Sequence, residues 1–148
     1  MRAELSVQLE RLQENLPAIR KIAGWRAIDL GSLLGVTKQS ISNLETHKSK
    51  MTLMQYIAIR HMIDYQITAH PENKALAHIV PLLLDVSPQS DQYNQVKKAG
   101  EEIANAAAGG VSDSVLVTIS DTLLSGKGKP KAEDWTAHIM AGIESCQE

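Results

Sequence analysis

Residues 35–50, GVTKQSISNLETHKSK, concentrate side chains that can hydrogen-bond to the bases of DNA. Ile41 and Leu44, three positions apart, predict a short helix over 38–45 with one buried side. The side facing away from the core then carries Ser42 and three residues with amide or ammonium groups, Lys38, Gln39 and Asn43. A Gln or Asn amide pairs a donor with an acceptor, which matches the edge of adenine, and a Lys ammonium donates to guanine. We therefore predict that these three residues contact bases.

A second group of side chains around this helix can bind the phosphates of a DNA backbone. Hydroxyl groups and backbone N–H groups at the start of a helix suit phosphate oxygens, and lysines add positive charge. The predicted phosphate contacts of this kind are Thr37, Ser40, Lys48 and Lys50. Polar residues on a short helix commonly face only water, so the elements around them must decide between the two interpretations.

Charge is unevenly distributed along the chain. Residues 1–70 contain nine Lys or Arg and six Asp or Glu, a net +3, whereas residues 71–148 contain six and eleven, a net −5. Within residues 20–50 the net charge is +4. A basic segment beside an acidic remainder indicates a nucleic-acid partner, although a solvated surface can produce the same imbalance.

The composition indicates a soluble globular protein, with 43% hydrophobic and 22% charged residues among 148. That length accommodates one ordinary domain or two small ones. The single cysteine, Cys146, cannot form an internal disulfide, so nothing indicates an oxidising compartment. No apolar run approaches the roughly 18 residues of a membrane span, and residues 1–16 are too polar for a signal peptide. We expect a cytoplasmic protein with no membrane partner.

Apolar residues recur at helical spacing through most of the chain, which predicts an all-α fold. In the N-terminal half, the expected helices are 3–14 and 16–23, separated at Pro17, then 27–34, 38–45 and one from Thr52 to about 66. In the C-terminal half, they are 72–80 with a kink or restart at Pro81, then 87–108, 112–126 and 132–145. For 112–126 a strand is the alternative, because apolar and polar residues alternate there.

The helices divide into two predicted regions. Residues 1–70 form an N-terminal domain in which 1–15 is an extra helix, and residues 71–148 form a helical C-terminal region. The first region carries apolar positions for a core of its own: Ile19, Ile22, Leu30, Leu33, Leu34, Ile41, Leu44, Leu53 and Ile57. Within it, helices 27–34 and 38–45 meet across a tight turn at 35–37, which is the geometry of a helix-turn-helix DNA-binding motif.

The segment LPAIRKIAGWRAIDLGSLLGVTKQSISNLETHKSKMTLMQYIAIRHMID resembles the helix-turn-helix domain of the XRE (Cro/phage-repressor) family over about residues 16–64. The matching positions are Arg20, Leu30, Gly35, Val36, Thr37, Ile41, Ser42, Leu44 and Glu45. The resemblance implies a lambda-repressor-like fold for this domain. It also implies that helix 38–45 is the recognition helix, with Lys38, Gln39 and Asn43 at its base-reading positions and Thr37 and Ser40 at positions that touch phosphate. Arg20 and Glu45 match an ion pair that ties the first family helix to the end of the recognition helix.

Three departures from the family pattern limit what can be transferred. Arg26 replaces the Ser or Thr cap before helix 27–34, and Ala27 replaces a Gln that often binds phosphate. Arg26 is predicted to supply that phosphate contact through its charge. The Gly that follows the family's Glu is replaced around Thr46 and His47, so the loop there is expected to differ in shape.

No other chemistry is predicted. The five histidines and the cysteine show no zinc-ligand spacing, so we expect neither a metal nor a cofactor, and no enzymatic activity. For residues 71–148 two roles remain open: dimerisation, or binding of an effector or a partner protein such as an antirepressor. A stripe formed by Leu5, Leu9, Leu12 and Leu16 is a second candidate dimer interface, and its alternative is packing within its own domain.

These features together predict a sequence-specific transcriptional regulator. It would bind a double-stranded operator as a homodimer, read a palindrome through the major groove and act as a repressor. The alternative is a protein that keeps this fold for protein contacts without binding DNA, such as an adaptor or an antitoxin-like partner.

Overall fold

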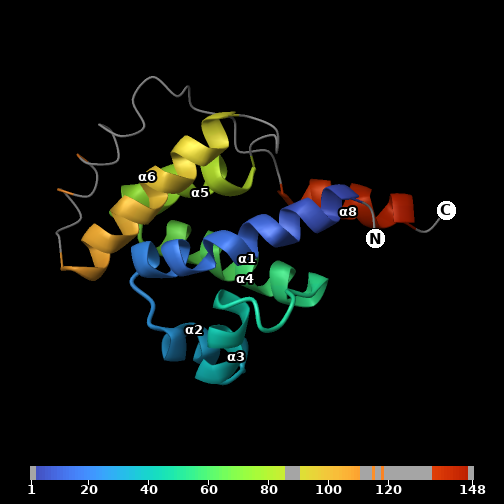
Figure 1. The fold of residues 1–148 in the computed structure, drawn as a ribbon, viewed down its shortest axis with the longest axis horizontal. Helices are drawn as coiled ribbons and strands as arrows, with labels where there is room; N and C mark the ends of the chain where they lie inside the picture. Colours follow the sequence, from blue (N-terminus) through green and yellow to red (C-terminus); the bar gives the residue numbers. More distant parts are fainter. Residues whose placement is uncertain (1–2, 86–90, 111–114, 116–117, 119–134, 147–148) are drawn as a thin grey trace.

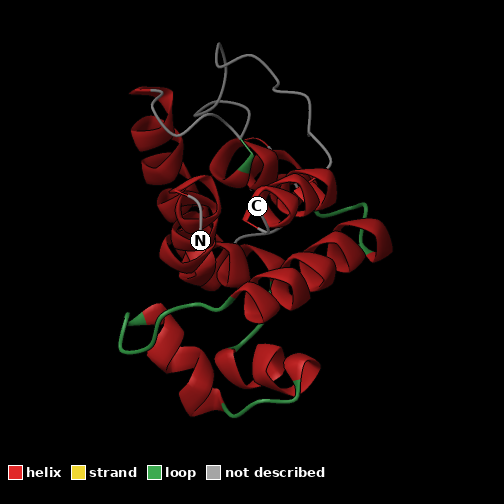
Figure 2. Ribbon diagram, turned by 90° about the vertical axis from the view of Figure 1, so that its right-hand side faces the viewer, coloured by secondary structure: helices red, strands yellow, loops and turns green. Residues whose placement is uncertain are grey.

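The computed structural model describes residues 3–85, 91–110, 115, 118 and 135–146. Every regular element in these ranges is a helix, so the predicted all-α class is confirmed (Figure 2). The elements are α1 (Ala3–Ala23), α2 (Ala27–Leu34), α3 (Lys38–Glu45), α4 (Leu53–Ala69), α5 (Lys74–Leu84), α6 (Asp91–Ala108) and α8 (Trp135–Cys146). The helix predicted over 112–126 lies outside the described residues except for 115 and 118.

The N-terminal segment forms one helix, where two were predicted. α1 continues through Pro17, which removes one backbone donor from the helix. Leu12, Leu16 and Ile19 lie on both sides of the proline and are fully buried on one continuous stripe. Burial of three such side chains stabilises the helix by about 1.5–3 kcal/mol each, which exceeds the roughly 3 kcal/mol cost of an internal proline. The separate helix predicted over residues 1–15 was therefore wrong. α5 likewise continues through Pro81.

α1 is the central element of the molecule and contacts α3, α4, α5, α6 and α8 (Figure 1). Leu5, Leu9, Leu12 and Leu16 are all buried within their own chain. The stripe is consequently not available as a dimer interface, because it packs within its own chain. Its packing partners include the C-terminal helices α5 and α6, in addition to the helices of the predicted N-terminal domain.

The hydrophobic core is continuous across the predicted boundary at residue 70. One cluster of buried side chains extends from Leu5 to Ile139. The chain turns at 70–73, and side chains on either side of the turn bind the end of α1. Gln66 Nε2 donates to the Ala23 carbonyl at 3.2 Å, and Asn73 Nδ2 donates to the Ile22 carbonyl at 2.9 Å. These bonds satisfy carbonyls that the end of a helix leaves without a partner.

Helices α2 and α3 lie at one end of the molecule, away from α5 and α6 (Figure 1). The buried residues of α2 are Leu30 and Gly31, and those of α3 are Ile41 and Leu44. Most of the residues predicted for the core are buried or pack against the buried cluster. Leu33 is the exception, because its side chain is 48% exposed. α2 has only two turns and buries Leu30 while Leu33, three positions later, stays exposed, so the prediction of Leu33 as a core residue was wrong.

Candidate nucleic-acid interface

The start of α3 is fixed by Thr37, a residue type that commonly caps the first turn of a helix. Thr37 Oγ1 accepts a hydrogen bond from the Ser40 backbone N–H at 3.1 Å. Thr37 and Ser40 also exchange a hydroxyl–hydroxyl bond of 3.0 Å. Ile41 and Leu44 then anchor the helix through its buried side. This leaves the first turn of α3 exposed, with its backbone N–H groups pointing out of the end of the helix.

Both helices of the pair end in the same backbone motif, which leaves a single residue with a positive φ just past the helix. After α2 that residue is Gly35, at φ 71°, and Val36 N donates to the Gly31 carbonyl at 2.8 Å. After α3 it is His47, at φ 61°, and Lys48 N donates to the Asn43 carbonyl at 2.9 Å. His47 thus adopts the conformation that glycine favours, and the loop keeps a tight helix end although the family's Gly is replaced.

The turn between α2 and α3 packs directly against α2. A Cβ atom at Gly31 would lie 2.8 Å from the Val36 carbonyl oxygen, closer than side-chain carbons approach. Gly31 is buried and helical, and its lack of a side chain leaves room for the backbone of the turn. The absence of a side chain at this position lets the turn approach α2 and sets the angle at which α3 leaves it.

The three predicted base-contact residues share the outer side of α3. Lys38 and Gln39 are exposed, and Asn43 is partly exposed one turn later. Gln39 Nε2 donates to Asn43 Oδ1 at 2.9 Å, so the two amides form one hydrogen-bonded unit. The Gln39 oxygen and the Asn43 amino group remain as an acceptor and a donor for a ligand. That combination suits a base edge which offers both a donor and an acceptor.

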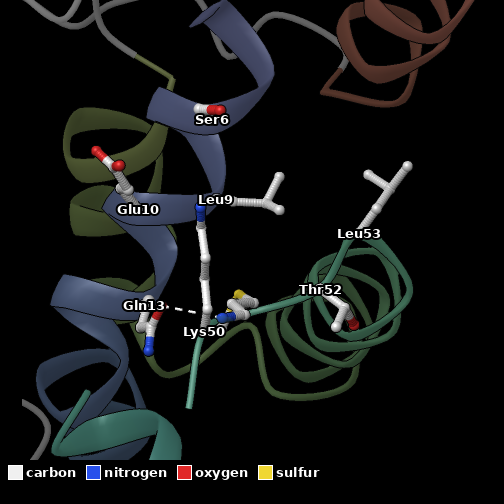
Figure 3. A pocket seen from close by; sticks show the side chains of 8 residues that line it. Ser6, Leu9, Glu10, Gln13, Lys50, Thr52 and Leu53 are labelled. Atoms are coloured by element: carbon white, nitrogen blue, oxygen red, sulfur yellow. Dashed lines mark hydrogen bonds between the residues drawn. The ribbon is translucent and has the colours of Figure 1, made fainter. Parts of the chain in front are cut away.

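The positively charged residues predicted to contact phosphate differ in whether they already pair with a carboxylate and in where their charge lies. Lys48 is exposed in the loop after α3. Arg26 forms two bonds of 3.0 Å to the carboxylate of Asp29, which lowers the pKa of Asp29 below its usual value. Any phosphate would share the Arg26 guanidinium with that carboxylate. Lys50 is exposed and extends along α1 beside Glu10, as Figure 3 shows, so its charge lies away from the exposed side of α3.

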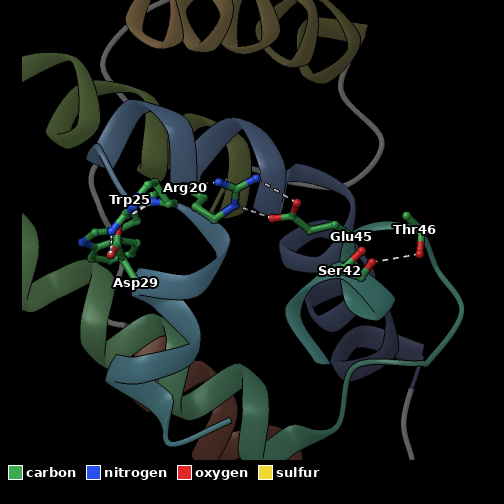
Figure 4. Close-up of polar contacts among 7 residues, drawn as sticks. Arg20, Trp25, Asp29, Ser42, Glu45 and Thr46 are labelled. Atoms are coloured by element: carbon green, nitrogen blue, oxygen red, sulfur yellow. Dashed lines mark hydrogen bonds and ion pairs between the residues drawn. The ribbon is translucent and has the colours of Figure 1, made fainter. Parts of the chain in front are cut away.

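Arg20 and Glu45 form the ion pair that the resemblance implies (Figure 4). Arg20 Nε and Nη2 donate to the two Glu45 oxygens at 2.6 and 3.0 Å. Arg20 Nη1 donates in addition to the Trp25 carbonyl at 2.9 Å. The two side chains are only 14% and 13% exposed. A bidentate pair with little solvent access fixes orientation, and here it holds the last turn of α3 against α1 and the start of α2.

Gln13 is a positioning residue that the sequence reading missed. Its buried amide nitrogen donates to the Leu44 carbonyl at 2.9 Å and to the Ser49 carbonyl at 2.7 Å. Its oxygen accepts from Met51 N at 3.1 Å. The signal was present, since position 13 falls on the buried stripe of α1 between Leu9 and Leu16. A polar residue on such a stripe indicates that a buried partner exists, although not which one.

The described part of the chain holds neither a metal-ligand cluster nor a membrane-spanning helix. No three His, Cys, Asp or Glu side chains there come together as metal ligands. Within the same residues, no helix combines the length and apolar character needed to cross a membrane. No protein-family model matches the chain, and no similar curated protein or solved structure was found. The XRE resemblance therefore stays a prediction from sequence.

Proposed function

We propose that this protein is a sequence-specific DNA-binding transcriptional regulator that inserts α3 into the major groove. The observation that carries the proposal is the outer side of α3, where Lys38, Gln39 and Asn43 lie together at one end of the molecule. The opposite side of the same helix is held by buried apolar residues, by the Arg20–Glu45 pair and by Gln13. A rigidly held helix with an exposed row of amide and ammonium groups is suited to reading base edges.

In this proposal the parts of the helix pair have separate roles. The linked amides of Gln39 and Asn43 contact an adenine, and Lys38 donates to a neighbouring guanine. Thr37, Ser40 and the N–H groups of the first turn bind one phosphate. Lys48 and Arg26 add charge near the backbone, the latter while sharing Asp29.

The regulator acts as a homodimer on a palindromic operator, since a single helix pair makes too few contacts for tight binding. It represses by occupying that operator. Residues 71–148 retain their two proposed roles, dimerisation or binding of an effector or antirepressor protein. Packing of α5 and α6 on α1 supports a third role for these residues. It stabilises α1, whose side chains hold α3 in position.

The test is binding of the full chain to the DNA upstream of its own gene, followed by fluorescence anisotropy at several salt concentrations. We expect a specific site, with affinity that falls steeply as salt rises because phosphate contacts release counterions. Lys48→Ala should weaken binding to all duplexes equally. It should also make the slope of log K against log salt shallower by about 0.9, which is the contribution of one phosphate contact. Lys98→Ala, an exposed lysine on α6, is the matched control and should leave both quantities unchanged. Salt-independent affinity would contradict DNA binding.

A protein-interaction role without DNA is the second candidate. The observation that favours it is exposure of large apolar side chains next to α3. Ile28, Leu33 and Val36, on α2 and the following turn, are 50%, 48% and 40% exposed. Exposed apolar side chains in number are typical of protein-binding surfaces. Absence of any salt-sensitive duplex binding, with the chain folded, would favour this adaptor or antitoxin-like role.

A further inference from the structure

Two neighbouring pockets form one groove along α1. The first, of about 350 Å³, opens between α1 and the start of α4 (Figure 3). The second, of about 450 Å³, lies beside the loop after α3, where His47 and Ser49 line it. Glu10, Gln13 and Lys50 line both pockets, so the two share a wall. Both volumes fall in the range of about 300–1,000 Å³ that is typical of small-molecule sites.

The first pocket is lined mainly by apolar side chains. Leu9, Met51 and Leu53 supply that lining, and Leu9 points toward the side of Leu53 in Figure 3. Leu9 and Met51 are only 4% and 2% exposed, so the core holds them and they form a fixed floor. Leu53 is partly exposed at the edge. An apolar group bound here would therefore remove further apolar surface from water.

The wall shared by the two pockets carries one available charge of each sign. Glu10 and Lys50 are both exposed, and within the described part of the chain the side chain of neither forms a hydrogen bond or an ion pair. The other carboxylate of the groove is already bound, because Glu14 pairs with Lys97 and accepts a bond of 3.0 Å from the Tyr93 hydroxyl. One carboxylate and one ammonium beside an apolar floor are complementary to an amphipathic zwitterion.

We propose that this groove binds a free α-amino acid with an apolar side chain. The ammonium group of the ligand pairs with Glu10 and its carboxylate pairs with Lys50. Its side chain enters the pocket formed by Leu9, Met51 and Leu53. The same ligand thus satisfies both charges and covers the apolar floor, which an ion or a purely apolar molecule does not do.

The groove also touches the residues that hold α3, which makes the ligand an effector. Gln13 lines both pockets and bonds the carbonyls of Leu44 and Ser49. A ligand held by Lys50 and Glu10 ties the loop after α3 to α1. It should restrict that loop and favour DNA binding, because less freedom is then lost when α3 docks. This effector role, unlike the site itself, rests on the proposed function.

Isothermal titration calorimetry of the full chain with L-leucine, L-methionine and L-phenylalanine tests the site without DNA. We expect one molecule of L-leucine to bind each chain with a Kd of about 0.1 mM, as its small size implies. Three analogues each lack one recognised group: 3-methylbutan-1-amine the carboxylate, 4-methylpentanoate the ammonium and glycine the apolar side chain. Each should bind at least about fivefold more weakly than L-leucine.

Variants of the two charged residues assign each contact. Glu10→Gln should weaken L-leucine about fivefold and should not weaken 4-methylpentanoate, which has no ammonium to lose. Lys50→Gln should show the reverse pattern, with L-leucine weakened and 3-methylbutan-1-amine unaffected. Lys98→Gln, an exposed lysine on α6, is the matched control and should bind all ligands as wild type does. All three positions are exposed in the chain, and unchanged thermal melting would show that the variants fold.

Absence of binding by all three amino acids at 5 mM would overturn the proposal. So would analogues that bind as tightly as L-leucine, or an equal loss in Lys98→Gln. Failure of these measurements is distinguishable from failure of the proposed function, since they contain no DNA.

The effector role has its own readouts. L-leucine at saturation should slow amide hydrogen exchange in residues 46–51, and unchanged exchange would overturn this role. In duplex anisotropy, the same ligand should raise operator affinity about fivefold, the lower end of ordinary coupling between two sites. An operator affinity that L-leucine leaves unchanged or lowers would contradict it, while the site itself would still be shown by calorimetry.

Discussion

The side chain of Gln13 accepts a hydrogen bond from the backbone N–H of Met51, 38 residues later in the chain, at 3.1 Å. The same amide donates to the Leu44 and Ser49 carbonyls. One side chain of α1 thereby bonds the end of α3, the loop after it and the segment leading into α4. Its position on a long, buried helix makes this a rigid support for α3.

Gln13→Ala should lower the free energy of unfolding by about 2–4 kcal/mol, because buried backbone groups lose their partners. It should also weaken specific DNA binding more than nonspecific binding, since the charges remain. Gln13→Glu separates the donor role from the acceptor role. A carboxylate beside two carbonyls cannot donate, so its folded pKa should be raised and its deficit relative to wild type should grow as pH rises from 4 to 7. Urea unfolding at both pH values measures this, and a pH-independent deficit would argue against the donor role.

Glu45→Ala should lower the free energy of unfolding by about 2–3 kcal/mol, somewhat less than for a fully buried pair, because Arg20 and Glu45 retain slight exposure. Arg20 would be left without its carboxylate in a site with little water. Arg26→Ala is the comparison, since the Arg26–Asp29 pair is solvent-exposed and its loss should leave thermal melting nearly unchanged. Equal melting of Glu45→Ala and wild type would show that the pair does not hold α3.

His47→Gly should stabilise the protein by about 0.5–1 kcal/mol, because the positive φ of His47 is strained for a residue with a Cβ. Glycine adopts this positive φ freely. It also raises the conformational entropy of the unfolded chain, which offsets part of the gain in stability. Thr46→Gly is the matched control one position earlier. Thr46 has a φ of −95° and donates to the Ser42 carbonyl, so this glycine should destabilise. Thermal melting distinguishes the two, and a destabilised His47→Gly would contradict the strain argument.

Gln39→Ala should cost about 1–3 kcal/mol on the best operator and relax the preference at one base pair of each half-site. Asn43→Ala should have a related effect, because the two amides are hydrogen-bonded in the free protein. The double variant should then lose less than the sum of the two single losses. Anisotropy with operators that carry single base-pair changes measures all three. An unaltered sequence preference in Gln39→Ala would place base reading elsewhere.

A fragment of residues 1–70 should be much less stable than the full chain, since the buried face of α1 loses its contacts with α5 and α6. A fragment of residues 1–110 keeps both helices and should retain most of the stability. Circular dichroism melting of the two fragments and the full chain measures the difference. Comparable melting of all three would show that the N-terminal helices are stable without the C-terminal half.

Local signals in the sequence determined most of the helix pair. Thr37 caps α3, Gly35 ends α2, and the spacing of Ile41 and Leu44 selects the buried side of α3 and therefore its outer side. These features depend on backbone geometry within a few residues, which is why a sequence suffices to predict them. The Arg20–Glu45 pair was anticipated only through the family resemblance, because nothing in a spacing of 25 residues indicates contact.

The tertiary structure decided the features that depend on distant partners. α1 continues through Pro17 because α5 and α6 cover its apolar stripe, and that burial outweighs the local cost of proline. Leu33 is exposed because, among the described helices, none covers its surface of α2. Gln13 bonds residues 31 to 38 positions away, and Lys50 lies beside Glu10 at a pocket that two separate helices create. Each outcome is set by which surfaces pack together, and helical periodicity specifies a buried side without specifying what buries it.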